Sequence, residues 1–152
     1  MADATFTIVE EHWDEAKKIA LEAARRGLEA VGIAAVTDVV AEISRPRKHA
    51  NGESKPLVDT GLLRNSITYA LDGEATAITN YEADSGGGSG SYSGTAPEES
   101  KGGAVYVGTN VEYAMYVEEG TSKHKAYPYL KSTIKKNLER YKQIFEQYTQ
   151  VP

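Results

Sequence analysis

The residues best suited to chemistry are scattered along this chain rather than grouped. The three histidines, His12, His49 and His124, lie in unrelated segments, and no two have the four-residue spacing of a helical zinc pair. Cysteine is absent, which excludes disulfides, thiolate metal sites and cysteine nucleophiles. We therefore expect no catalytic residues, no metal site and no cofactor.

Two further patterns contain residue types that occur in functional sites. The glycine-rich run 86–90 is followed by neither a Lys-Ser/Thr pair nor a helix, so it is interpreted as a flexible loop and not a phosphate loop. The carboxylates of Asp59, Glu112, Glu118 and Glu119 could converge on a divalent cation, but no EF-hand-like spacing joins them. A metal-dependent hydrolase is accordingly the least supported of three functional hypotheses.

Composition limits the other hypotheses. The 152 residues suffice for one domain over 1–152 with one core, and no apolar run approaches the roughly 18 residues of a membrane span. A formal charge of -5 argues against a protein that mainly coats nucleic acid, because such binding depends on Lys and Arg. Residues 121–142 are nevertheless basic. A small nucleic-acid-binding module that uses them with Arg45, Arg47 and Lys48 is the second hypothesis.

Hydrophobic periodicity predicts an α+β fold whose first half is a helix followed by antiparallel strands. The helix is expected over 9–43 and ends at 44–46, because a residue before proline avoids helical angles. Alternation over 66–72 predicts a strand with one buried face, and Asp72-Gly73 predicts a hairpin turn into a strand over 74–80. The helix carries a seam of small residues for tight packing: Trp13, Ala16, Ala20, Ala23, Gly27, Ala30 and Ala34.

The second half is expected to complete the sheet and cover it. A Gly/Ser-rich loop over 82–103, whose composition cannot build a core, precedes a short strand at 105–107. A short helix is predicted over 111–118, with Gly120 as its left-handed stop. An amphipathic C-terminal helix over 128–148 is expected to form the main lid over the sheet. Its apolar stripe is Leu130, Ile134, Leu138, Tyr141, Phe145 and Tyr148.

Two blocks of sequence, followed by a third short one, carry a recognisable pattern. They are Val58-Asp59-Thr60-Gly61-Leu62-Leu63-Arg64-Asn65-Ser66-Ile67, then 105–121, then Ala126-Tyr127-Pro128-Tyr129-Leu130. In this order they resemble the tail-completion, or head-tail joining, family of long-tailed bacteriophages. The resemblance spans roughly Leu57 to Thr133, and the long preceding helix fits the family layout. Glu119 replaces an aromatic residue common before Gly-Thr, and Tyr129 replaces the usual Phe.

The resemblance implies a structural virion protein of the phage tail and neck, which joins the finished tail to the DNA-filled head and has no catalytic activity. Its implied partners are further copies in a ring, the tail terminator, head-closure or adaptor proteins and the tail tube. DNA would pass through the channel without sequence-specific binding. The implied location is the virion, after assembly in the host cytoplasm. The motif and interface candidates are Asp59, Thr60, Gly61, Leu63, Arg64, Tyr113, Tyr116, Glu118, Gly120, Thr121, Pro128 and Tyr129.

A physical hypothesis accompanies the resemblance. Ten tyrosines supply the amphipathic contact area that is enriched at interfaces. We expect about half of those at 106, 113, 116, 127 and 129 to be core residues, and the others to join the small-residue seam in subunit contacts. Ordering each loop residue costs roughly 1–2 kcal/mol of backbone entropy. The Gly/Ser-rich loop is therefore expected to reach a neighbouring subunit or neck protein.

Overall fold

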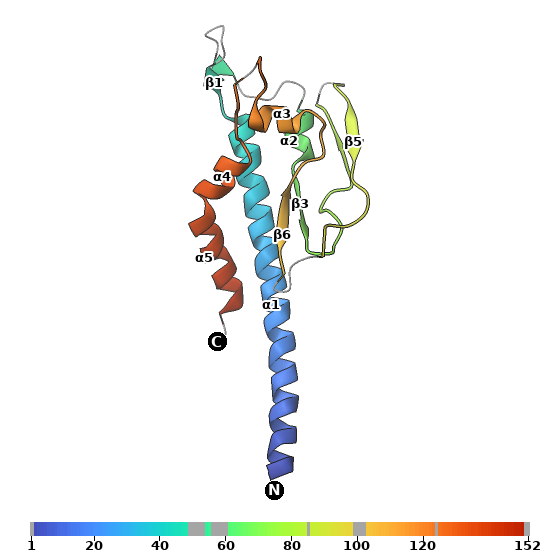
Figure 1. Ribbon diagram of the computed structural model, residues 1–152, viewed down its shortest axis with the longest axis vertical. Coiled ribbons are helices and arrows are strands. Elements are labelled where there is room, and N and C mark those ends of the chain that lie inside the picture. The colour runs from blue at the N-terminus through green and yellow to red at the C-terminus, as the bar shows by residue number, and fades with distance from the viewer. Residues whose placement is uncertain are drawn as a thin grey trace.

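A computed structural model of the chain describes residues 2–48, 54–55, 61–84, 86–98, 103–123 and 125–150. In the first two of these segments, side chains are described for residues 15–46 only. The fold is α+β, as predicted, with a long N-terminal helix, short antiparallel strand pairs and C-terminal helices (Figure 1).

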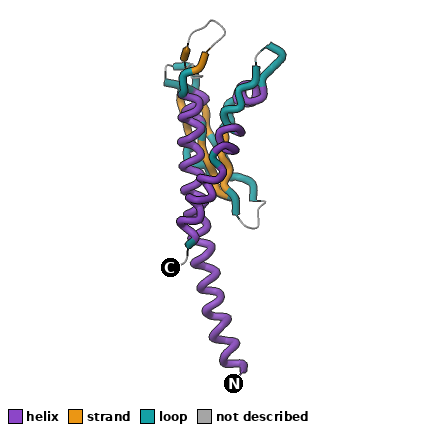
Figure 2. Tube along the Cα trace, turned by 90° about the vertical axis from the view of Figure 1, so that its left-hand side faces the viewer, coloured by secondary structure: helices purple, strands orange, loops and turns teal. Residues whose placement is uncertain are grey.

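Helix α1, Ala2–Ser44, runs the length of the molecule. Its C-terminal half packs against the remaining elements, whereas its N-terminal half projects beyond them in both views (Figures 1 and 2). The predicted C-terminal end is confirmed. The predicted start at residue 9 is wrong by seven positions, because Thr5 and Thr7 are weak helix formers that do not stop a helix already nucleated downstream.

The sheet that faces α1 joins strands far apart in sequence. Strand β3, Thr68–Leu71, pairs antiparallel with β6, Val105–Gly108, with Tyr69 opposite Val107. Both strands pack against α1. Two further antiparallel pairs complete the strands. Strand β1 (Arg47–Lys48) pairs with β2 (Ser54–Lys55), and β4 (Asn80–Glu82) pairs with β5 (Ser89–Ser91).

The predicted hairpin is wrong in its second strand. The turn itself forms, since Gly73 has φ 72° and the Glu74 amide donates to the Leu71 carbonyl at 2.9 Å. After a single bridge between Ala70 and Thr76, however, the chain leaves β3. Ile78 then packs against the hydrophobic core, so burial of its side chain competes with continued pairing along β3. The antiparallel partner of β3 is instead β6, on its other edge.

The alternation predicts that β3 has one buried and one exposed face, and this prediction is wrong. Thr68, Ala70 and Leu71 are all buried. Helix α1 lies on one face, and on the other face Thr68 and Ala70 line a small hollow together with Tyr92. The segment around Tyr92 belongs to the predicted Gly/Ser-rich loop, which therefore contributes to the body of the fold.

The Gly/Ser-rich segment contains β5, which the prediction of a loop without structure missed. The Tyr92 hydroxyl donates to the Ser66 carbonyl at 2.6 Å, and the Asn110 side-chain amide donates to the Ser91 carbonyl at 2.8 Å. The Tyr81 and Tyr92 rings lie 5.6 Å apart. These contacts with distant residues anchor the segment within its own chain, and composition alone could not reveal them.

The remaining helices are short: α2 (Leu62–Ser66), α3 (Ala114–Glu119), α4 (Lys131–Lys136) and α5 (Leu138–Thr149). The single C-terminal helix predicted over 128–148 is thus broken at Asn137, whose φ of -107° and ψ of 9° are not helical. Its side-chain amide donates to the Thr133 carbonyl at 2.8 Å, which favours the break by offering that carbonyl another donor. Leu138 and Tyr148 of the predicted apolar stripe are exposed.

Helix α5 is not a lid over the sheet. It packs along α1, and α1 lies between α5 and the β3–β6 pair (Figure 1). Two glycines of α1 allow these approaches, because a Cβ on Gly27 would lie 2.8 Å from the Phe145 ring, and one on Gly32 would lie 2.7 Å from the Tyr69 ring. Tight packing at Gly27 confirms that part of the predicted seam, whereas Ala16 and Ala20 are exposed.

Candidate functional site

The sequence blocks that carry the resemblance meet in one hydrophobic core. Leu63 from the first block, Ala114 from the second and Tyr129 from the third are buried in the same cluster with Val39 and Ile43 of α1. Asp59 and Thr60 lie outside the described residues, as do His49 and His124. The structure therefore brings the described parts of the three blocks together, mainly through their apolar members.

Helix α2 is tied to β4 by its polar residues. Arg64 forms an ion pair with Asp84, and the Asn65 side-chain amide donates to the Asp84 carboxylate at 2.9 Å and to the Glu82 carbonyl at 2.8 Å. Gly61 begins the helix with φ 86°, and a Cβ there would clash with the Asp84 carboxylate. Gly61, Leu63 and Arg64 thus position α2 by backbone conformation, burial and charge.

Glu118 and Tyr129 act in the same structural way. The Glu118 carboxylate, 9% exposed, accepts hydrogen bonds from the Leu130 and Lys131 amides, both at 2.9 Å, where α4 begins. Tyr129 is 2% exposed, and its hydroxyl donates to the Ala114 carbonyl at 3.2 Å. Burial raises the pKa of Tyr129 to about 12, and the nearby Glu118 charge adds to this effect. Both groups are therefore committed to contacts within the fold.

The turn after α3 follows the prediction in part. The Gly120 amide donates to the Tyr116 carbonyl at 2.8 Å, and its φ of 79° is the positive value expected of a glycine stop. Its ψ of 175° is not that of a left-handed turn, however, so α3 passes directly into extended chain. Thr121 and Pro128, in the segment that follows, are exposed.

One side of α3 presents apolar and aromatic side chains to solvent. Tyr113, Met115 and Tyr116 are 40%, 65% and 62% exposed. Tyr113 and Tyr116 are among the interface candidates predicted from the sequence, whereas Met115 is not. The buried residues Val111, Ala114 and Glu118 follow three- and four-residue steps, which leaves position 115 facing outward. Because Glu118 is charged, apolar periodicity alone did not mark this face.

Part of α1 projects from the body, and we call this segment the stem; its described side chains are those of residues 15–22. Every one of these residues is exposed, including Ile19 at 58% and Leu21 at 62%. Ile19 and Leu21 thus leave apolar area exposed on a helix segment that otherwise carries mainly charged side chains.

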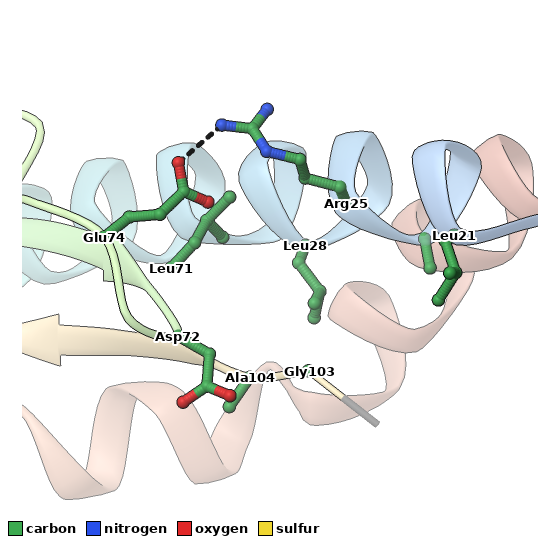
Figure 3. Close-up of a pocket in the computed structure, with 9 residues that line it drawn as sticks. Leu21, Arg25, Leu28, Leu71, Asp72, Glu74, Gly103 and Ala104 are labelled. Atoms are coloured by element: carbon green, nitrogen blue, oxygen red, sulfur yellow. Dashed lines mark hydrogen bonds and ion pairs between the residues drawn. The ribbon is translucent and has the colours of Figure 1, made fainter. Parts of the chain in front are cut away.

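An open apolar hollow of about 200 Å³ lies where the stem meets the body. It is lined by Leu21 and Leu28 of α1, Leu71 of β3 and Ala104 just before β6, and Arg25 forms a 2.7 Å ion pair with Glu74 at its rim (Figure 3). Leu21 therefore belongs both to the stem and to the lining of this hollow, which also includes the polar residues Arg25, Asp72 and Glu74.

Charged groups at the other end of α1 serve a local network. The Glu42 carboxylate accepts hydrogen bonds from Arg45 at 2.8 Å and from the Tyr127 hydroxyl at 2.5 Å, and these lower its pKa, with Arg45 as the larger cause. Among the described residues, no group of three His, Asp or Glu side chains could hold a metal ion. Exposed bases gather instead along the C-terminal region: Lys123, Lys125, Lys131, Lys135, Lys136, Arg140 and Lys142.

No protein-family model, curated protein or solved structure matches this chain. Within the part of the chain that the structure describes, no helix combines the length and apolar character needed to cross a bilayer.

Proposed function

We propose that this chain is a structural subunit of a bacteriophage neck, a tail-completion or head-tail joining protein that acts in the virion by assembling into a ring. The observation that carries the assembly role is the stem, a helical segment whose described side chains are all exposed. The resemblance of the three sequence blocks to the tail-completion family is the reason for placing this assembly in the phage neck. The further partners would be the neighbouring neck and tail proteins.

Energetics support a partner for the stem. Most helical stability in proteins comes from packing of an apolar face, whereas the described side chains of the stem are all exposed. Burial of Ile19 and Leu21 in an interface would each contribute about 1.5–3 kcal/mol. Leu21 also lines the hollow where the stem meets the body, so a partner that covers Leu21 would lie beside that hollow as well.

The roles of the motif residues support a structural protein over an enzyme. Glu118 holds two backbone amides, Tyr129 is buried, and Arg64 is paired with Asp84. These contacts fix the positions of α2, α3 and α4, and they leave the aromatic side of α3 outward. Such an arrangement presents aromatic and apolar contact area to solvent.

The first experiment asks whether the protein is part of a virus particle. Particles purified from the source strain after phage induction should contain this chain, detected by mass spectrometry in stoichiometric amounts with the tail tube protein. Its absence from every purified particle would contradict the neck assignment.

A second experiment tests the stem. The double variant Ile19→Ser with Leu21→Ser should lower assembly of the purified chain, measured by native mass spectrometry with and without tail tube protein. The matched control is Lys18→Ser with Glu22→Ser, which changes equally exposed stem residues without removing apolar area. Equal assembly by both double variants would contradict a role for the apolar stem residues.

A second candidate function, DNA binding, is favoured by the exposed bases of the C-terminal region. Affinity for duplex DNA should then fall steeply as salt rises, since each neutralised phosphate releases counterions. Weak contact alone fits a protein that lines a DNA channel. Tight binding by a chain that is absent from particles would favour the nucleic-acid-binding module instead.

A further inference from the structure

The β3–β6 pair leaves one edge open. The Asp72 amide donates to the Ala104 carbonyl at 2.9 Å, and this bond fixes which residues of β6 point their backbone toward β3. Because the pattern alternates in antiparallel pairs, Tyr106 and Gly108 bond to β3, whereas the N–H and C=O groups of Val105 and Val107 point away from it. Among the described residues, no hydrogen bond reaches these outward groups.

The same alternation identifies a second edge on β5. The Tyr92 amide donates to the Thr79 carbonyl at 2.8 Å, and the Ala83 amide to the Gly88 carbonyl at 2.9 Å. The backbone groups of Ser89 and Ser91 therefore point away from β4. The Ser91 carbonyl accepts from the Asn110 side chain, but no hydrogen bond within the described part of the chain reaches the Ser89 backbone.

Each edge carries outward backbone groups that no hydrogen bond reaches among the described residues. They belong to Val105 and Val107 on β6 and to Ser89 on β5, whereas the Ser91 carbonyl is held by Asn110. Both serines are exposed and small, so an incoming strand can approach β5 closely. Figure 1 places β5 on the side of the molecule away from α1, and β6 beside α1. The β6 edge of one copy can therefore meet the β5 edge of the next copy, which is a head-to-tail contact.

We propose that β5 of one copy adds to the open edge of β6 in the next, so that neighbouring subunits are joined by backbone hydrogen bonds. Exposed strand edges are templates for pairing with another chain, and the partner they select is an extended polypeptide. This proposal deepens the assembly role above and rests on it only in taking a second copy as the partner. It also assigns the Gly/Ser-rich segment a specific contact.

The test uses the full chain with Ser89→Pro, which removes the outward N–H. Ser89→Ala is the matched control, since it keeps the N–H and loses only an exposed hydroxyl. Proline is tolerated on edge strands, and urea unfolding of the dilute monomer verifies that both variants fold. Ser89→Pro should raise the concentration for half-assembly by about tenfold or more, and Ser89→Ala should leave it within about twofold.

Amide hydrogen exchange resolved by residue gives an independent readout. The Val105 and Val107 amides should exchange slowly in the assembled wild-type protein and rapidly in the dilute monomer. The proposal is overturned if these amides exchange equally in both states, if the chain stays monomeric at high concentration, or if Ser89→Pro assembles like Ser89→Ala. Protection that appears only when a different protein is added would assign the edge to that protein and also overturn it. Detection in virus particles, which tests the proposed function, is unaffected by any of these results.

Discussion

Asp38 on α1 and Tyr141 on α5, 103 positions apart in the sequence, are joined by a 2.7 Å hydrogen bond from the tyrosine hydroxyl to the carboxylate. Tyr141 is buried, and both burial and this bond raise its pKa, burial being the larger cause. Arg140 pairs with the same carboxylate, so three side chains fasten the C-terminal helix to α1.

Tyr141→Phe should therefore lower the free energy of unfolding by about 1–3 kcal/mol, because the hydrogen bond is to a charged acceptor. Urea denaturation measures this change. Tyr148→Phe is the control, since Tyr148 lies on the same helix and is 45% exposed. Equal midpoints for the two variants would mean that the bond to Asp38 contributes nothing to stability.

Glu118→Ala should destabilise the protein by about 2–3 kcal/mol, because two half-buried amides at the start of α4 lose a charged acceptor. Glu119→Ala is the neighbouring control. Its carboxylate is exposed and lies 3.8 Å from the Lys131 ammonium, an ion pair worth less than about 1 kcal/mol. Unfolding followed by circular dichroism would contradict this account if the Glu119 variant were the less stable of the two.

Gly27→Ala and Gly32→Ala should both destabilise the protein, although alanine is the better helix former by about 1 kcal/mol. At Gly27 the new methyl group would meet the flexible Phe145 ring at 2.8 Å, whereas at Gly32 it would meet both Tyr69 and Val105, at 2.7 and 2.9 Å. Overpacking of this kind costs about 1–3 kcal/mol, and Gly32→Ala should be the more severe. Combining Gly27→Ala with Phe145→Leu should recover stability in thermal melts; failure to recover any would refute the steric explanation.

Stability should fall in alkali through Tyr129. Its neutral phenol is favoured in the fold, where the pKa is about 12, while an unfolded tyrosine ionises near pH 10. The unfolded chain therefore binds fewer protons between these values, so stability present below about pH 10 is lost as pH rises toward 12. Tyr129→Phe should be less stable at pH 8 but show a shallower decline between about pH 10 and 12. An identical pH slope for both proteins in urea titrations would exclude Tyr129 as the source.

Sequence patterns predicted those elements whose signals are local. The long helix ends where Arg45 precedes a proline, Gly73 turns the chain, and a strand begins at Val105, because backbone preference or hydrophobic periodicity acts over a few residues. Arg64 and Glu118 are candidates because of the family resemblance, and that resemblance does not predict which residues they contact. Their neighbours, Asp84 and the Leu130 amide, come from separate segments.

Tertiary structure decided which segments pair and which surfaces stay open. The local turn at Gly73 favoured a hairpin, but burial of Ile78 and pairing with the distant β6 left only one bridge beside it. Likewise, its composition predicted that the Gly/Ser-rich segment is a flexible loop, but hydrogen bonds of Tyr92 and Asn110 anchor it to the body. Local propensities are worth tenths of a kcal/mol per residue, and burial of one large side chain is worth about 1.5–3 kcal/mol. Long-range burial therefore overrides them, and only the folded chain shows where.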